Sequence, residues 1–212
     1  MTNIRTDSLN GVLVQYKKTS FRLTDEELNI IVNKDYHQPM ENHLTKTRFL
    51  LKDPRLKRIK NFLDEHMKNY IENTVEIENK FIMTQSWSTT TKKGERHHPH
   101  NHPNNIFSLV FYVDAVEDSG NIMFNLESRL RERYNFSFKV KNWNTFNSYS
   151  WEYQVRTGDL ILFPSWVTHE TKPNLSDKNK IIIGANYFVH DVIQNGSGVE
   201  KMDIQLGDVD DD

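Results

Sequence analysis

The chain has 212 residues, with 27 basic and 29 acidic side chains, a formal net charge of -2 and no cysteine. The balance of charge argues against a nucleic-acid-binding or membrane-surface protein, and the lack of cysteine excludes disulfides and thiolate metal ligands. We expect one domain over residues 1–212, with no membrane-spanning segment and a cytoplasmic location.

Residues 1–80 carry the helical patterns of the chain. Thr24 and Glu27 form the capping-box pattern at the start of a short amphipathic helix. Asp53 followed by Pro54 is a second helix start, and apolar residues then recur at spacings of three and four from Leu56 to Ile71. This region is therefore expected to pack helices against the rest of the domain.

From residue 81 the pattern changes to short apolar runs separated by turns. With one run near the N-terminus, strands are predicted at 12–16, 81–88, 106–113, 122–124, 151–155, 159–163, 167–171 and 181–189. About eight antiparallel strands is the number found in a jelly roll. We expect a mainly β protein with N-terminal helices (an α+β arrangement), a jelly-roll core over 81–190 with a long insertion at 126–150, and an acidic C-terminal tail at 191–212.

Four histidines stand within six positions of the segment HHPHNHP, which runs from His97 to Pro103. Neutral imidazole is a common metal ligand, and so many imidazoles in one short segment are costly as a packing device. A further histidine, His169, follows a turn and an apolar strand about sixty residues later. In a barrel of antiparallel strands it can face back across the interior, so one metal ion could be shared.

Over residues 81–190 the sequence resembles the iron(II)- and 2-oxoglutarate-dependent oxygenases. The resemblance rests on His-x-His-Pro at 100–103, Ser-x-x-x-Tyr at 108–112, Gly-Asp-Leu-x-x-Phe-Pro-Ser-Trp-x-x-His at 158–169, and Lys180 with Asn186 in one strand. It implies a double-stranded β-helix, the cupin-like jelly roll of that family. It also implies an enzyme that uses iron(II), 2-oxoglutarate and O2, and hydroxylates a substrate while 2-oxoglutarate is decarboxylated to succinate.

The positions that match the family's motifs give the implied site residues. The metal ligands would be His100, His102 and His169. Lys180 stands where the family places a basic partner for the far carboxylate of 2-oxoglutarate, although the subgroup more often has arginine there. A lysine would act as a point charge rather than as a bidentate partner. Further candidates for 2-oxoglutarate contacts are Tyr112, which fits a core aromatic equally well, and Asn186 and Ser108.

The ligand set departs from the superfamily pattern, in which a carboxylate follows the first histidine as His-x-Asp or His-x-Glu. Here His102 stands in that place, so the site is a three-histidine centre, takes a carboxylate from Glu95 or Asp114, or holds another metal. His98 and His100 also form a His-x-His pair, but Pro103 favours the later pair. His97 and His98 would then lie behind the metal ligands, face the substrate or stand at the surface, and we expect the surface position.

Two other functions fit the same pattern. One is a cupin-like metalloprotein, such as a three-histidine dioxygenase or an isomerase, that does not use 2-oxoglutarate; the other is a non-enzymatic jelly-roll structural protein. The position of Lys180 distinguishes the cupin-like metalloprotein from the oxygenase, because the oxygenase needs this lysine inside the barrel. The main substrate, a small molecule or a peptide, stays open, as does a homodimer. Trp143 is a candidate for the mouth of the site, while Trp87 and Trp166 are expected in the core.

Overall fold

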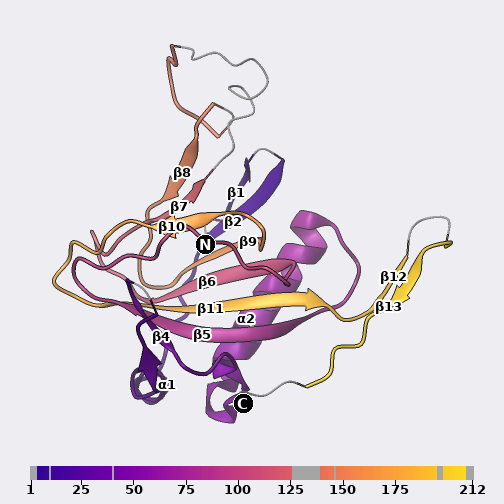
Figure 1. Cartoon of the computed structure of the whole chain (residues 1–212), viewed down its shortest axis with the longest axis horizontal. Coiled ribbons are helices and arrows are strands. Elements are labelled where there is room, and N and C mark those ends of the chain that lie inside the picture. Colours follow the sequence, from indigo (N-terminus) through magenta and orange to yellow (C-terminus); the bar gives the residue numbers. More distant parts are fainter. Residues whose placement is uncertain are drawn as a thin grey trace.

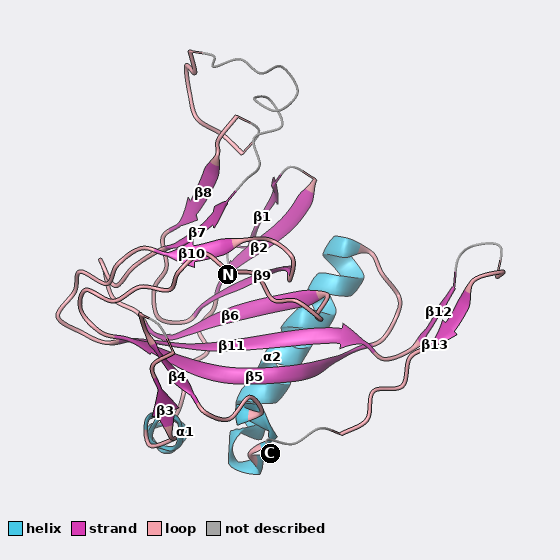
Figure 2. Cartoon of the chain, viewed as in Figure 1, coloured by secondary structure: helices cyan, strands magenta, loops and turns pink. Residues whose placement is uncertain are grey.

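The computed structural model describes residues 4–9, 11–39, 41–125, 139–145, 147–194 and 198–208. Its strands form an eight-stranded sheet in the order β1-β2-β9-β6-β11-β5-β4-β3, a three-stranded sheet in the order β10-β7-β8, and a β12-β13 hairpin (Figures 1 and 2). The strands are β1 (Ile4–Leu9), β2 (Val12–Lys18), β3 (Tyr36–His37), β4 (His43–Thr45), β5 (Phe81–Thr91), β6 (Phe107–Asp114), β7 (Ile122–Asn125), β8 (Ser150–Tyr153), β9 (Asp159–Pro164), β10 (His169–Thr171), β11 (Lys180–Val189), β12 (Val192–Gln194) and β13 (Lys201–Asp203). The helices are α1 (Asp25–Val32), α2 (Lys57–Tyr70) and the short turns η1 (Leu50–Lys52), η2 (Pro54–Leu56) and η3 (Ile71–Val75).

The eight predicted strands are present as β2 and β5 to β11, with bounds that differ by a few residues. Strands β1, β3 and β4, at the edges of the large sheet, and the β12-β13 hairpin were not predicted. Of the insertion predicted at 126–150, residues 126–138 and 146 lie outside the described part of the chain, and so do residues 195–197 and 209–212 of the tail predicted at 191–212.

The two predicted helix starts are confirmed. The Glu27 amide donates to Thr24 Oγ1 (3.2 Å) and the Thr24 amide donates to the Glu27 carboxylate (2.9 Å), which completes the capping box of α1. Asp53 accepts from the Arg55 amide and caps η2, which leads directly into α2. Helix α2 then crosses one face of the large sheet (Figure 1).

Alternation along the central strands divides the large sheet into an outer and an inner face. On the outer face, side chains such as Leu109 and Ala185 pack against the apolar stripe of α2, which includes Leu63 and Met67. On the inner face, residues of β6 and β9 pack against Phe124 and others from the small sheet. The space between the two sheets is therefore the interior to which inward-pointing side chains of β5, β6, β9 and β11 belong.

Gly184 of β11 lies opposite Trp87 of β5, with the indole packed over it. A Cβ at Gly184 would lie 2.5 Å from Trp87 Cζ2, and the indole is 92% buried and therefore has little room to move. We expect Gly184→Ala to lower the free energy of unfolding by about 1–3 kcal/mol, as overpacked cores do. Urea denaturation measures this, with Gly207→Ala as the control because no atom lies within 4 Å of its Cβ position. Equal stability of the two variants would contradict the expectation.

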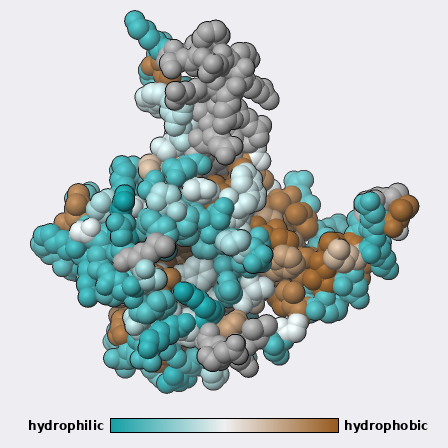
Figure 3. All heavy atoms as spheres, in the orientation of Figure 1, coloured by the Kyte–Doolittle hydropathy of each residue, from teal (hydrophilic) through white to brown (hydrophobic). Residues whose placement is uncertain are grey.

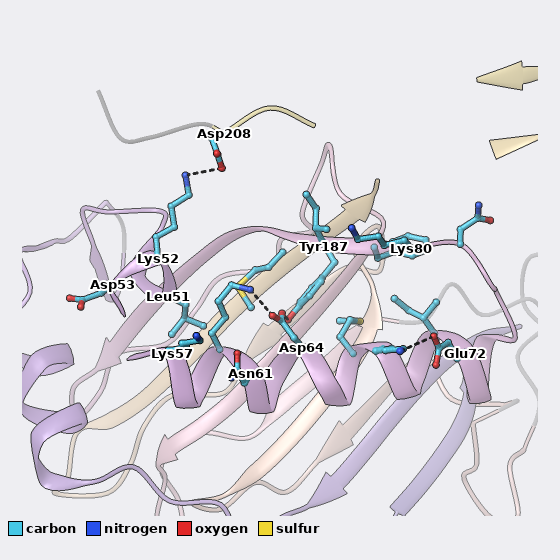
Figure 4. Close-up of a pocket in the computed structure, with 18 of the residues that line it drawn as sticks. Leu51, Lys52, Asp53, Lys57, Asn61, Asp64, Glu72, Lys80, Tyr187 and Asp208 are labelled. Atoms are coloured by element: carbon cyan, nitrogen blue, oxygen red, sulfur yellow. Dashed lines mark hydrogen bonds and ion pairs between the residues drawn. The ribbon is translucent and has the colours of Figure 1, made fainter. Parts of the chain in front are cut away.

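A groove of about 1140 Å³ lies on the outer face, between α2, the start of β5 and Asp208 (Figure 4). Its charged side chains include the ion pairs Lys60–Asp64 and Lys68–Glu72, and no histidine lines it. In the view of Figure 3, apolar side chains gather between the body and the β12-β13 hairpin. The histidine segment is instead hydrogen-bonded to β10 of the small sheet, so the candidate site lies on the inner side of the large sheet. No helix in the described part of the chain is long and apolar enough to cross a membrane.

Candidate metal centre

The histidine segment runs alongside the part of the chain around β10, and backbone hydrogen bonds join the two. His100 and His169 exchange both backbone hydrogen bonds, at 3.0 and 2.9 Å. On either side of this bridge, the His102 amide donates to the Ser165 carbonyl (2.9 Å) and the Thr171 amide donates to the His97 carbonyl (3.0 Å). Two segments more than sixty residues apart in the sequence are thus joined at the positions where their histidines stand.

This pairing brings together the three histidines predicted as ligands. His100, His102 and His169 each offer a ring nitrogen, and these atoms lie within 4.8 Å of one another. The ring centroids are 4.3 Å apart for His100 and His169, and 5.1 Å apart for each pair that includes His102. The rings are inclined by 37 to 87°, an arrangement in which their lone pairs can converge on one ion.

A second group, His97, His98 and His100, meets the same distance criterion. However, the His97 and His100 rings are stacked, with centroids 4.0 Å apart and planes only 17° from parallel. An ion bound by imidazole lies near the plane of the ring, and two stacked rings share no such point. The geometry therefore favours the group that contains His102 and His169, which is the later of the two His-x-His pairs.

Hydrogen bonds orient two of the three imidazoles. The Nδ1 atom of His100 lies 2.8 Å from the His98 carbonyl oxygen, and Nδ1 of His169 lies 3.0 Å from the Val167 carbonyl oxygen. Because a carbonyl oxygen only accepts, each Nδ1 carries the proton and each Nε2 keeps its lone pair. A backbone carbonyl that fixes the tautomer in this way is common behind metal-binding histidines.

The surroundings keep these rings neutral. Burial is the main cause that lowers the pKa of all three, to about 3 for His102 and well below the ordinary value for His169. Phe163 and Phe124 pack beside His169, and Trp87 packs beside His102. Three unprotonated imidazoles in an apolar setting are a donor set that fits a divalent transition metal.

Neither carboxylate considered from the sequence joins the histidines. Glu95 pairs with His43 (3.1 Å) and accepts from the Lys92 amide. Asp114 ends β6, and no carboxylate belongs to either histidine group within the described ranges. In the described ranges, the side-chain groups that could hold a metal ion thus consist of histidines alone.

Lys180, at the start of β11, is 98% buried and donates to the Gly120 carbonyl (2.7 Å). Burial lowers the pKa of this ammonium group to about 8. Tyr112 is also buried on the inner face, and it pairs with Ile182, two residues from Lys180 on the same face of β11. Burial raises the pKa of Tyr112, with the nearby Asp159 carboxylate adding to the effect, so the phenol is a neutral donor.

Ser108 and Asn186 face each other across β6 and β11, and the Ser108 hydroxyl donates to the Asn186 side-chain carbonyl (2.8 Å). Asn186 is six residues from Lys180, about 20 Å along an extended strand. The Ser108 hydroxyl also lies 2.8 Å from that of Ser165, whose carbonyl accepts from the His102 amide. The pair therefore lies at the His102 end of the inner face, away from Lys180.

Some side chains lie where the sequence did not predict them. His97 and His98 are half-buried rather than at the surface. Trp87 is in the core as expected, whereas Trp166, which was also expected there, is 65% exposed. Trp143, the candidate for the mouth of the site, is 60% exposed. Trp166 follows the end of β9 in a turn, and an aromatic in such an apolar run gives no signal of which way it points.

Comparisons with known proteins show which family the sequence resembles. The family model described as "Putative 2OG-Fe(II) oxygenase" matches residues 85–186. No curated relative matches the chain. The region matched includes His100, His102, His169 and Lys180.

Similar solved structures share the fold at low identity. The α-ketoglutarate-dependent carbocyclase SnoK from nogalamycin biosynthesis has 14% identity and a TM-score of 0.58, and the match covers 91% of this chain and 90% of that chain. HygX from Streptomyces hygroscopicus, with nickel, 2-oxoglutarate and hygromycin B bound, has 14% identity, a TM-score of 0.56 and coverage of 84% and 82%. A Pseudomonas putida prolyl-4-hydroxylase has 11% identity, a TM-score of 0.52 and coverage of 81% and 91%.

These likenesses confirm the double-stranded β-helix core, and the family match decides between the oxygenase and the two alternative functions. Residues 85–186 of the chain match the iron(II)- and 2-oxoglutarate-dependent oxygenases, enzymes that use iron(II), 2-oxoglutarate and O2.

Proposed function

We propose that His100, His102 and His169 hold the iron of this oxygenase, and that Lys180 binds the far carboxylate of 2-oxoglutarate. The observation that carries the proposal is the group of three neutral imidazoles within 4.8 Å, together with one buried ammonium group on the same interior face. The proposed reaction is hydroxylation of a small molecule or peptide that is not yet identified.

When bound, iron(II) would activate O2, which is the oxidant: one oxygen atom would go into succinate as 2-oxoglutarate loses CO2, and the other into the hydroxylated substrate. The part of this chain is to hold the metal ion, to orient the co-substrate and to exclude water. The Nδ1 hydrogen bonds of His100 and His169 fix the ring positions before any ion binds. The apolar wall of Phe124, Phe163 and Trp87 limits the access of water to the centre.

Lys180 acts as a positive charge inside the barrel. A buried ammonium group without a countercharge is costly, and a carboxylate would supply that charge. Tyr112, one pleat away on the facing strand, offers its hydroxyl to the same carboxylate in this proposal. Ser108 and Asn186 would contact the other end of 2-oxoglutarate, next to the metal, because they adjoin His102 through Ser165.

The direct test is an anaerobic titration of the metal-free protein with iron(II) and then with 2-oxoglutarate. A 2-oxo acid that chelates iron(II) gives a weak visible charge-transfer band, and we expect this band to saturate at one equivalent of iron. Tight iron binding with no band at any 2-oxoglutarate concentration would contradict the assignment of the site.

We also infer a cytoplasmic location, without a nucleic-acid partner. The absence of cysteine suits a reducing compartment, and the net charge of -2 offers no broad basic surface. Cell fractionation followed by immunoblotting tests the compartment.

A further inference from the structure

We propose that His97 is a second donor to the far carboxylate of 2-oxoglutarate and that it acts together with Lys180. The inference rests on the proposed function and deepens it, because it assigns a co-substrate contact to a residue outside the metal triad. Five kinds of observation carry it: the backbone anchors of His97, the stacking of its ring, its unused nitrogen atoms, its burial, and the chemistry of a lysine as carboxylate partner.

The backbone holds His97 at the Lys180 end of the interior. The His97 amide donates to Thr171 Oγ1 (2.9 Å), and its carbonyl accepts from the Thr171 amide (3.0 Å). Thr171 pairs with Ile122 of β7, two residues after Gly120, whose carbonyl holds the Lys180 ammonium group. His97 and Lys180 are thus anchored at the same end of the β7-β10 ladder.

The ring of His97 is fixed by its stacking on His100, at 4.0 Å between centroids. This stacking keeps it from sharing an ion with the metal triad, yet it leaves the ring beside the triad on the side of Thr171. The side chain is half-buried, and burial is the main cause of its lowered pKa, followed by the nearby histidines and by Lys180. The influence of Lys180 agrees with the placement that the backbone gives.

The nitrogen atoms of the His97 ring have no partner in the part of the chain that the structure describes. The ring of His100, by contrast, donates from Nδ1 to a carbonyl. Neither nitrogen of this ring is among the buried atoms without a partner, so the edge of the ring is accessible to a ligand. A ligand carboxylate between the triad and Lys180 would give the His97 N–H an acceptor.

The chemistry of lysine explains why a second donor is useful. An arginine in this position can donate to both oxygens of a carboxylate, whereas the ammonium group of Lys180 is a point charge. One of its three hydrogens is already committed to Gly120. A buried carboxylate needs donors for both oxygens, and the His97 N–H supplies the one that the lysine lacks.

The test compares two 2-oxo acids on the iron(II) protein under anaerobic conditions. 2-Oxoglutarate has the far carboxylate, whereas 2-oxobutyrate has the same metal-chelating end without it. His97→Phe keeps an aromatic ring on His100 but removes the donor, and His98→Phe is the matched control in the same loop. His97→Gln keeps an N–H donor without the ring.

We expect His97→Phe to weaken 2-oxoglutarate binding by about 10- to 100-fold, the usual effect of one hydrogen bond to a charged group. Binding of 2-oxobutyrate and of iron(II) should not change. His97→Gln should recover a large part of the 2-oxoglutarate affinity, and His98→Phe should bind both acids like the wild type.

The outcomes separate this inference from the proposed site. If His97→Phe binds 2-oxoglutarate as the wild type does while Lys180→Met loses affinity, the inference is wrong and the proposed site stands. An equal loss for both acids would place the effect at the metal-binding end and also overturn the inference. If Lys180→Met binds both acids normally, or the wild type forms no band, the proposed function fails at the carboxylate or metal end, and this inference fails with it.

Discussion

Replacing His169 with alanine is expected to abolish the iron(II) and 2-oxoglutarate charge-transfer band and to lower iron affinity by more than 100-fold. Residues that only orient a ligand already cost about 10- to 100-fold when they are lost, and His169 is proposed to bind the ion itself. Iron affinity falls because the two remaining imidazoles of the triad cannot hold the ion in a preformed site. Equilibrium iron titration and the visible band measure the two effects.

The variant must be shown to fold, because the His169 ring is buried against Phe163 and Phe124. His169→Gln fills more of that space without restoring an imidazole and should lose iron in the same way. His190→Ala is the control, since His190 follows β11 and its Nδ1 accepts from the Leu206 amide, away from the triad. A folded His169→Gln protein that keeps the band would refute the assignment of His169.

The central strands and the helix starts could be predicted because their signals are local. The capping box of Thr24 and Glu27 and the apolar run of β6 are readable within a few residues. Strands β3 and β4 were missed because they are two and three residues long and lie at a sheet edge. The β12-β13 hairpin was missed because each of its strands has only three residues and, in the described part of the chain, pairs only with the other.

The site could be predicted as far as residue type and order carry information. The histidine spacing and the motif around His169 indicated which imidazoles would meet. Whether His97 is exposed depends on the bridge between His100 and His169, which is a contact between distant segments. The end of the interior at which Asn186 lies depends on the register of β11 with β6, which a single strand does not specify.

Removing the charge of Lys180 is expected to weaken 2-oxoglutarate binding by about 10- to 150-fold, as for a hydrogen bond to a charged group. Lys180→Met is the preferred variant because an unbranched, uncharged side chain fills most of the space of the buried lysine. The band of 2-oxobutyrate should not change, since that acid has no far carboxylate. Anaerobic titration of both acids measures the difference, and Ser176→Ala, on the loop before β11, serves as the control.

The pH dependence gives a second, independent test of the same residue. Burial lowers the pKa of Lys180 to about 8, so the free protein loses the ammonium charge as the pH rises through that value. A bound carboxylate favours the charged form, so binding takes up a proton above that pH and affinity falls by up to about tenfold per pH unit. Below pH 8 the affinity should be nearly constant.

Lys180→Met should bind weakly with no such transition, and Lys180→Arg should bind without it because arginine stays charged. A wild-type affinity that is flat from pH 7 to about 9 would show that the ammonium group does not face the carboxylate.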